Sequence, residues 1–182
     1  CIRDSIGVGG YGRVHLEAIA AAEARGLGRL AAAVILPGLE PRTEAELAKR
    51  GVRIYRSSGE MLERAARDVP GGMRLVGIPC GIPEHAPLAI AALEAGFDVL
   101  CEKPAAGSLA DALPMRDASR RTGRLLAIGF QNLWTPSLRR IKELALEGRG
   151  GGGLGRLLWA RSCATWPRTR AYYERNGWAG RL

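Results

Sequence analysis

Two short stretches of the sequence carry residue types that can do chemistry. The first, IGVGGYGRVH, places Gly7, Gly9 and Gly12 in a G-x-G-x-x-G spacing between a short apolar run and an amphipathic stretch. In such a turn the first glycine allows a tight bend, the second lets a pyrophosphate approach the backbone, and the third lets the next helix pack closely. The spacing predicts a dinucleotide-binding turn that includes Gly10 and Tyr11, although a glycine-rich turn can also be purely structural.

The second stretch, FDVLCEKPAAG, brings Glu102 and Lys103 to the end of an apolar run. A lysine ammonium at such a place can orient a substrate hydroxyl, or share its proton as hydride leaves the carbon. The following proline fixes the backbone, and the Lys103–Pro104 peptide bond could be cis. The same residues are equally compatible with a surface ion pair before a turn.

The stretch that should bind the adenosine ribose lacks its usual carboxylate. In dinucleotide-binding units an acidic residue follows the second strand and holds the ribose hydroxyls. Here that run ends in Leu36 and Pro37, the first carboxylate is Glu40, and the nearest arginine is Arg42. Leu36 at the ribose position weakens the case for strict NAD preference and does not establish NADP. We therefore predict NAD or NADP as the cofactor and leave the preference open.

The alternation of apolar runs and amphipathic segments predicts a doubly wound α/β fold of the Rossmann type. Apolar runs typical of strands occupy residues 4–8, 29–36, 52–55, 73–78, 97–102 and 124–130. Amphipathic segments that predict helices occupy residues 11–25, 41–50, 57–68, 84–95 and 108–122. Such alternation indicates a parallel sheet covered on both faces. Ligands bind outside the carboxyl ends of its strands, so we expect the glycine turn and Lys103 at the same edge.

Local signals place several helix ends. Ser57 with Glu60, and Ser108 with Asp111, have the spacing of a capping box. Pro114 lies inside the last of these predicted helices, so it should kink that helix or mark a later start. Glycines stand where three of the predicted helices should stop: Gly51, Gly96 and Gly123.

The character of the chain changes after residue 130. One more helix is expected over residues 135–148, followed by a glycine run, a strand over residues 155–165, and an aromatic, arginine-rich segment to the end. We predict a dinucleotide-binding domain over residues 1–130. Residues 131–182 would then form a connecting helix and the incomplete start of a second, α+β domain.

Composition and charge argue against several other classes of protein. The chain of 182 residues has a net charge of +9, but its basic residues are scattered and aromatic residues make up only 5%, so we expect no nucleic-acid partner. No apolar run is long enough to span a bilayer, so no membrane partner is expected. Four well-separated cysteines and two histidines predict no metal site, no disulfide framework and a cytoplasmic location.

The sequence resembles the Gfo/Idh/MocA family of NAD(P)-dependent oxidoreductases over nearly its whole length. The resemblance rests on the segments GVGGYGRVH, GIPCGIPEHAPLAIAALEAGFDVLCEKPAAGSLADA and IGFQNLWTPSLRRIKELALEG. It implies that Lys103 lies beside the nicotinamide and the reacting hydroxyl of a polyol or sugar-like substrate. It also implies that Pro79, His85 and Glu102 belong to the cofactor site, with His85 bordering the cofactor and not shuttling protons. His15 is expected to be structural.

The tail TRAYYERNGWAGRL resembles the start of the second domain in one subgroup of this family. That resemblance implies substrate contacts from Tyr173, Arg175 and Trp178, with packing as the alternative role. Family members continue through a large sheet that walls the substrate pocket and contributes an aspartate–histidine pair, whereas this chain has no histidine after His85. We therefore expect a truncated chain that binds cofactor but turns over little, and homo-oligomers only for the complete chain. The alternative is a non-catalytic dinucleotide-binding sensor or scaffold.

Overall fold

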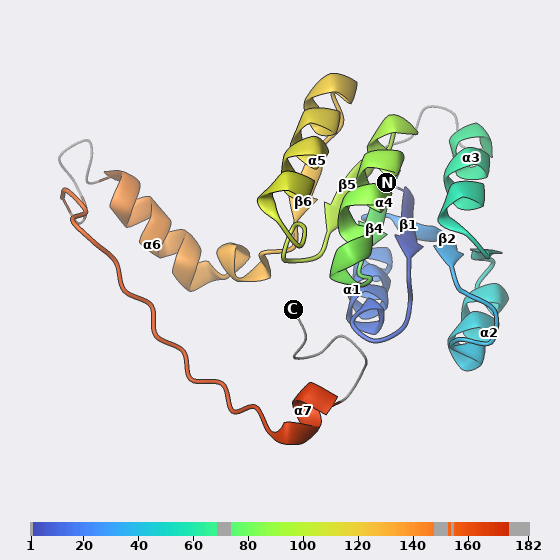
Figure 1. Ribbon diagram of the computed structural model, residues 1–182, viewed down its shortest axis with the longest axis horizontal. Helices are drawn as coiled ribbons and strands as arrows, with labels where there is room; N and C mark the ends of the chain where they lie inside the picture. The colour runs from blue at the N-terminus through green and yellow to red at the C-terminus, as the bar shows by residue number, and fades with distance from the viewer. Residues whose placement is uncertain (1, 69–73, 148–152, 154, 175–182) are drawn as a thin grey trace. The chain divides into compact units, whose positions relative to one another are not determined.

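The computed structural model describes residues 2–68, 74–147, 153 and 155–174. The chain divides into two compact units, Cys1–Gln131 and Asn132–Leu182. The first unit is an α/β domain, and the second consists of helices joined by irregular backbone (Figure 1).

A six-stranded sheet forms the centre of the first unit (Figure 1). Its strands are β1 (Ile2–Ile6), β2 (Arg29–Val34), β3 (Arg53–Tyr55), β4 (Arg74–Ile78), β5 (Asp98–Cys101) and β6 (Leu126–Ile128). Their spatial order is β3-β2-β1-β4-β5-β6, and every neighbouring pair is parallel. The order reverses between β1 and β4, which is where doubly wound sheets bind ligands. The predicted fold class is confirmed.

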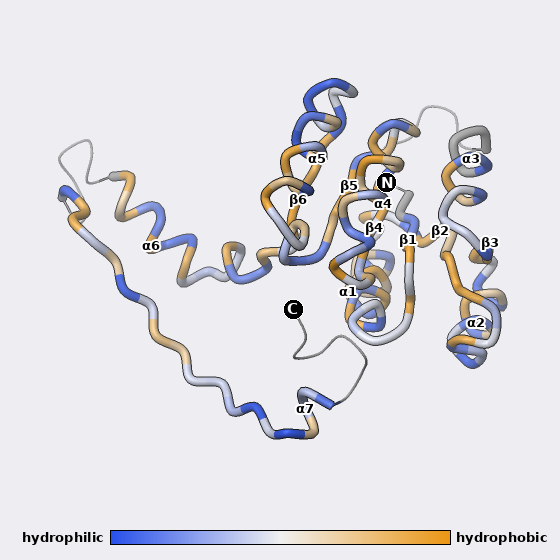
Figure 2. Tube along the Cα trace, viewed as in Figure 1, coloured by the Kyte–Doolittle hydropathy of each residue, from blue (hydrophilic) through white to orange (hydrophobic). Residues whose placement is uncertain are grey.

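Helices cover both faces of this sheet. On one face lie α1 (Gly12–Ala24) and α2 (Pro41–Lys49); on the other lie α3 (Ser58–Asp68), α4 (Ile82–Glu94) and α5 (Leu109–Thr122). A separate apolar core fills each side. The core under α1 and α2 contains Val8, Ile19, Leu30, Ala33, Ile35, Leu47 and Val52. The larger core under α3, α4 and α5 centres on Met61, Val76, Ile78, Leu93, Phe97 and Met115. Figure 2 shows hydrophobic residues along the strands and along the helix faces that meet them.

Two serines cap helices in the first unit. The Glu60 N–H donates to Ser57 Oγ, and the Asp111 N–H donates to Ser108 Oγ, each at 3.2 Å. Each bond satisfies one of the N–H groups that a first helical turn leaves without a partner. The two predicted caps are confirmed.

Helix α5 does not start after its internal proline. It begins at Leu109 and runs through Pro114, so the prediction of a later start is wrong. The Ser108 cap fixes the beginning of the helix on one side of the proline. On the other side, the buried side chains of Met115 and Ala118 hold the helix to the core. Packing on both sides therefore outweighs the backbone hydrogen bond that proline cannot donate.

The second unit holds most of η1 (Gln131–Trp134), together with α6 (Pro136–Glu147) and α7 (Arg170–Glu174). The helix predicted over residues 135–148 is confirmed by α6, but residues 155–169 form neither helix nor strand. The strand predicted over residues 155–165 is therefore wrong. A strand needs a hydrogen-bonding neighbour, and this apolar segment has every side chain exposed.

The tryptophans are confined to one end of the sequence. All four come after Gln131. The three described ones, Trp134, Trp159 and Trp166, are between 69% and 76% exposed. Within the described residues, no helix combines the length and the apolar character needed to cross a membrane.

Candidate functional site

The glycine turn between β1 and α1 has the conformation that a dinucleotide requires. Gly7 has a φ of 102°, which side chains rarely allow. At Gly12, an added Cβ would lie 2.8 Å from the Gly7 carbonyl oxygen, so only glycine lets the helix start this close to the strand. At Gly10 an added Cβ would meet no atom within 4 Å. The backbone at Gly10 is thus open at the N-terminus of α1, which fits a pyrophosphate.

Lys103 lies at the same edge of the sheet as the glycine turn. It follows the carboxyl end of β5, is exposed, and places its Nζ 5.9 Å from the centroid of the Tyr11 ring. The Lys103–Pro104 peptide bond is cis, as the sequence allowed. The structure therefore brings the lysine and the turn together, as the topology predicted.

The carboxylate of Glu102 is buried in the protein and does not face solvent. Glu102 is only 9% exposed, and its Oε1 lies 2.9 Å from Nε2 of His15 on α1. Its Oε2 accepts the backbone N–H of Lys103 at 3.1 Å. An added Cβ at Gly129 would lie 2.9 Å from Oε1, so glycine there leaves room for the carboxylate. The alternative interpretation of Glu102 and Lys103 as a surface ion pair is therefore wrong.

His15 connects the first helix to the end of β5. Besides contacting Glu102, its ring packs edge-on against Tyr11 at a centroid distance of 5.8 Å. The sequence predicted only a structural role, because the contact joins residues 87 positions apart and no local pattern reports it. Tyr11, His15 and Glu102 thus lie together beneath Lys103.

His85 holds together the two loops that border the site. The ring is 1% exposed; Nδ1 lies 2.8 Å from the carbonyl oxygen of Pro104, and Nε2 lies 3.1 Å from that of Cys80. Both nitrogens therefore face backbone carbonyl oxygens. Pro79 packs at the turn, because its Cγ would lie 3.5 Å from a Cβ added at Gly12.

The two cysteines near the site are poor nucleophiles. Burial raises the pKa of Cys80 to about 11 and the pKa of Cys101 to about 12. Cys80 also lies beside the turn, with its Cβ 3.9 Å from a Cβ added at Gly7. The thiolate is the reactive form of cysteine, so both side chains are packing residues at neutral pH.

The loop after β2 carries a carboxylate to the glycine turn. Leu36, at the expected ribose position, is 55% exposed. Four residues further on, Glu40 places its Oε1 2.9 Å from where a Cβ on Gly9 would lie. Its Oε2 accepts a 2.6 Å hydrogen bond from Nη2 of Arg13. The sequence shows that Glu40 is the first carboxylate after the strand. It does not show that the Glu40 side chain points toward the glycine turn.

The residues predicted to bind substrate belong to the second unit. Tyr173 lies in α7, half exposed, with its ring edge-on to Tyr172 at 5.4 Å. Arg175 and Trp178 lie outside the described residues.

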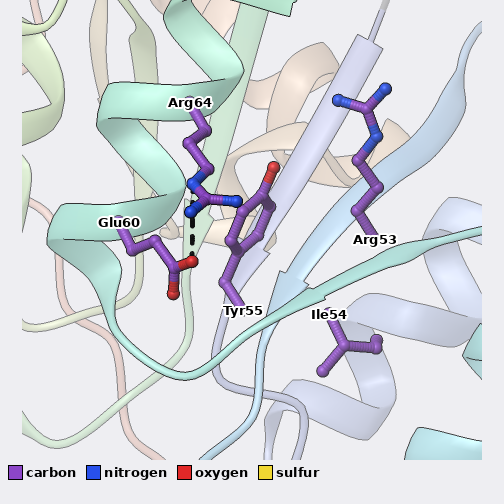
Figure 3. A pocket seen from close by; sticks show the side chains of 5 residues that line it. All are labelled: Arg53, Ile54, Tyr55, Glu60 and Arg64. Carbon is purple, nitrogen blue, oxygen red and sulfur yellow. Dashed lines mark ion pairs between the residues drawn. The ribbon is translucent and has the colours of Figure 1, made fainter.

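A cavity of about 440 Å³ lies elsewhere in the first unit, between the edge strand β3 and α3. Figure 3 shows Glu60 and Arg64 of α3 beside the Tyr55 ring of β3, with an ion pair of 3.5 Å between the two charged groups. Arg53 and Ile54 complete the lining. None of the predicted cofactor residues lines this cavity.

The doubly wound sheet, its glycine turn and the lysine that follows β5 at the same edge define a dinucleotide-binding domain of the Rossmann type. A family model described as an oxidoreductase family with an NAD-binding Rossmann fold matches residues 5–130. The chain belongs to this family, the Gfo/Idh/MocA oxidoreductases. The family resemblance stated from the sequence is confirmed.

Several relatives are named as dehydrogenases. The chain is 33% identical over 147 residues to inositol 2-dehydrogenase from Streptomyces avermitilis, covering 80% of this chain and 40% of the relative. It is 36% identical over 104 residues to inositol 2-dehydrogenase 3 from Saccharopolyspora erythraea, covering 52% of this chain and 30% of the relative.

A solved structure shows the same fold. The WlbA dehydrogenase from Chromobacterium violaceum, in complex with NADH and UDP-GlcNAcA, matches with a TM-score of 0.73 at 23% identity, covering 98% of this chain and 48% of that one. The chain thus spans less than half the length of each of these relatives.

Proposed function

We propose that residues 1–130 bind NAD or NADP for a dehydrogenase that moves hydride between a secondary alcohol carbon and the nicotinamide. Residues 131–182 would belong to the substrate domain of the same enzyme. One observation carries this proposal: the glycine turn and Lys103 lie at one edge of the sheet, with the Tyr11 ring 5.9 Å from the lysine Nζ. A phosphate-binding turn next to a free ammonium is what a nicotinamide-dependent alcohol dehydrogenase needs.

The residues of the site divide into binding and positioning groups. The nicotinamide, when bound, supplies the hydride acceptor or donor. Gly7, Gly9, Gly10 and Gly12 provide the backbone that would cradle the pyrophosphate, and Tyr11 lies between the turn and the lysine. Lys103 would hold the reacting hydroxyl at Nζ and exchange its proton.

Glu102 and His85 would hold the backbone around Lys103 in place. Glu102 accepts the backbone N–H of Lys103 while it contacts His15, so the lysine backbone is tied to α1. His85 joins the Pro104 and Cys80 carbonyl oxygens and fixes the two loops relative to each other. Pro79 packs against the turn, on the side proposed for the nicotinamide. Such fixed backbone keeps a reacting group within the narrow range of positions that catalysis requires.

A polyol or sugar-like compound is the proposed substrate. The relatives named as inositol 2-dehydrogenases support this class, because inositol is a cyclic polyol. Tyr173, Arg175 and Trp178 are the proposed substrate contacts, since aromatic faces and a guanidinium suit a hydroxylated ring.

Three described cysteines, Cys80, Cys101 and Cys163, are free thiols, which supports a reducing, cytoplasmic location.

A fluorescence titration of the purified chain with NADH, and separately with NADPH, tests cofactor binding. We expect saturable binding of at least one of them, and its loss in Gly9→Val, because a side chain there blocks the approach of the pyrophosphate. Gly59→Val is the matched control: Gly59 lies in α3, where an added Cβ meets no atom within 4 Å. A chain with a normal circular dichroism spectrum that binds neither dinucleotide would overturn the proposal, as would unchanged binding by Gly9→Val.

A further inference from the structure

We propose that Glu40, oriented by Arg13, replaces the missing ribose carboxylate and makes the site select NAD over NADP. This inference rests on the proposed function, because it requires that the glycine turn binds a dinucleotide. It concerns the preference that Leu36 leaves open.

The position of the Glu40 carboxylate is the first support. In dinucleotide-binding domains the ribose next to the adenine lies between the glycine turn and an acidic residue that follows the second strand. Here Leu36 stands at the strand end with a side chain that cannot accept a hydrogen bond. Glu40 Oε1 instead lies 2.9 Å from the place of a Cβ on Gly9, the second glycine of the turn.

The backbone of Glu40 is the second support. Its φ of 56° and ψ of 47° are left-handed, and it is the only non-glycine residue of the described part with a positive φ. A long side chain seldom adopts this conformation, which persists only where the surroundings hold it and is concentrated at ligand sites. Left-handed backbone here aims the side chain back at the turn from the residue that immediately precedes α2.

The hydrogen bonds of the Glu40 carboxylate use one of its two oxygens, and the other oxygen points toward the glycine turn. Among the described residues, two side chains donate to this carboxylate and both reach Oε2, at 2.6 Å from Arg13 Nη2 and 3.3 Å from Thr43 Oγ1. Oε1 therefore faces Gly9 and can accept a ribose hydroxyl. The bond from Arg13 also lowers the pKa of Glu40, which keeps the carboxylate ionised at neutral pH.

The charge of Glu40 distinguishes the two cofactors. NAD presents two ribose hydroxyls, and each can donate to a carboxylate oxygen. NADP carries a phosphate in place of one hydroxyl of this ribose. The negative charges of the phosphate would be repelled by the ionised Glu40 carboxylate, and the hydrogen bond from the replaced hydroxyl would be lost. Arg13 donates its Nη2 N–H to Glu40, so the guanidinium is oriented toward the carboxylate.

Another carboxylate four residues further along the chain provides a matched control. Glu44, on α2, also pairs with an arginine, and both of its oxygens are occupied by the guanidinium of Arg56. The side-chain exposures are similar, 24% for Glu40 and 28% for Glu44. Glu44→Gln therefore removes the same charge four residues away without changing a residue that contacts the glycine turn.

The experiment measures dissociation constants for NADH and NADPH by nicotinamide fluorescence in the wild type, Glu40→Gln and Glu44→Gln. A hydrogen bond to a charged group contributes about ten- to hundredfold in affinity. We therefore expect the wild type to bind NADH at least about tenfold more tightly than NADPH. Glu40→Gln should reduce this ratio by about tenfold, mainly by weakening NADH. Glu44→Gln should leave the ratio unchanged.

The possible failures are distinguishable. Equal or tighter binding of NADPH by the wild type would overturn the inference, and so would an unchanged ratio in Glu40→Gln; NADH binding would still support the proposed function. Absence of binding of both dinucleotides by the folded wild type would overturn the proposed function and this inference together. An Arg13→Gln variant gives an independent check. This variant should bind NADH more weakly, because Glu40 loses its orienting partner. A selective loss of NADPH binding would instead assign Arg13 to the phosphate and overturn the inference.

Discussion

Replacing Asp4 by asparagine is expected to stabilise the protein at neutral pH and not in acid. Asp4 lies in β1, between β2 and β4, and is only 3% exposed. Among the described residues, its Oδ1 has no hydrogen-bond partner. Burial raises the pKa of Asp4 from its ordinary value of 3.8 to about 6, although a backbone hydrogen bond from Ala32 and the charge of Arg74 act in the opposite direction. An ionised carboxylate at this position therefore costs free energy.

The size and sign of the effect follow from that pKa. Because the folded value lies above the unfolded one, the native state holds the proton more tightly. The resulting stabilisation is complete below about pH 4 and is lost as the pH rises through about 6. A difference of 1 between the folded and unfolded pKa corresponds to about 1.4 kcal/mol. The wild type should therefore lose ~3 kcal/mol of folding stability that Asp4→Asn does not lose. Asparagine cannot ionise, but its amide can still accept the Ala32 hydrogen bond.

Urea unfolding at several pH values between about 4 and 7.5 measures this difference. Far-ultraviolet circular dichroism is the suitable signal, because it reports on the helices and strands of the first unit, which contains no tryptophan. The free-energy difference between Asp4→Asn and the wild type should grow by ~2.5 kcal/mol across this range, whatever its value at the acidic end. Ile78→Val, at a fully buried position, is the control and should cost about 1 kcal/mol at every pH. A difference for Asp4→Asn that does not change with pH would refute the reasoning.

Two further predictions concern the cap of α5 and the cysteines. Ser108→Ala removes the hydroxyl that caps the helix and should cost about 1 kcal/mol in the same urea assay; a loss below about 0.3 kcal/mol would contradict a capping role. With iodoacetamide at pH 8, exposed Cys163 should be alkylated first, whereas Cys80 and Cys101 should react only after denaturation, because burial keeps their thiols protonated. Peptide mass spectrometry follows each site, and native modification of Cys80 at the rate of Cys163 would contradict this account.

The sheet and its glycine turn were predictable because their signals are local. Each strand is a short apolar run followed by a helix with its own period, and the caps at Ser57 and Ser108 are read within four residues. The strand expected over residues 155–165 failed for the opposite reason. Its composition suits a strand, but a strand exists only with a neighbour, and composition does not supply one.

The site was predictable in outline and not in its contacts. Topology alone places Lys103 and the glycine turn at one edge. The direction of the Glu102 side chain depends on His15, and that of Glu40 depends on Arg13, 27 residues away. Such pairings depend on how the elements pack in space, so a periodic pattern along the chain contains no record of them.

The placement of the tryptophans allows energy transfer from indole to bound NADH to be used as a distance measurement. Indole emission overlaps the absorption band of reduced nicotinamide, so energy transfer between them falls steeply with distance. The indoles are all in the second unit, and the proposed NADH site is in the first. Quenching of indole emission by bound NADH would therefore report the separation of the two units in solution, without any added label.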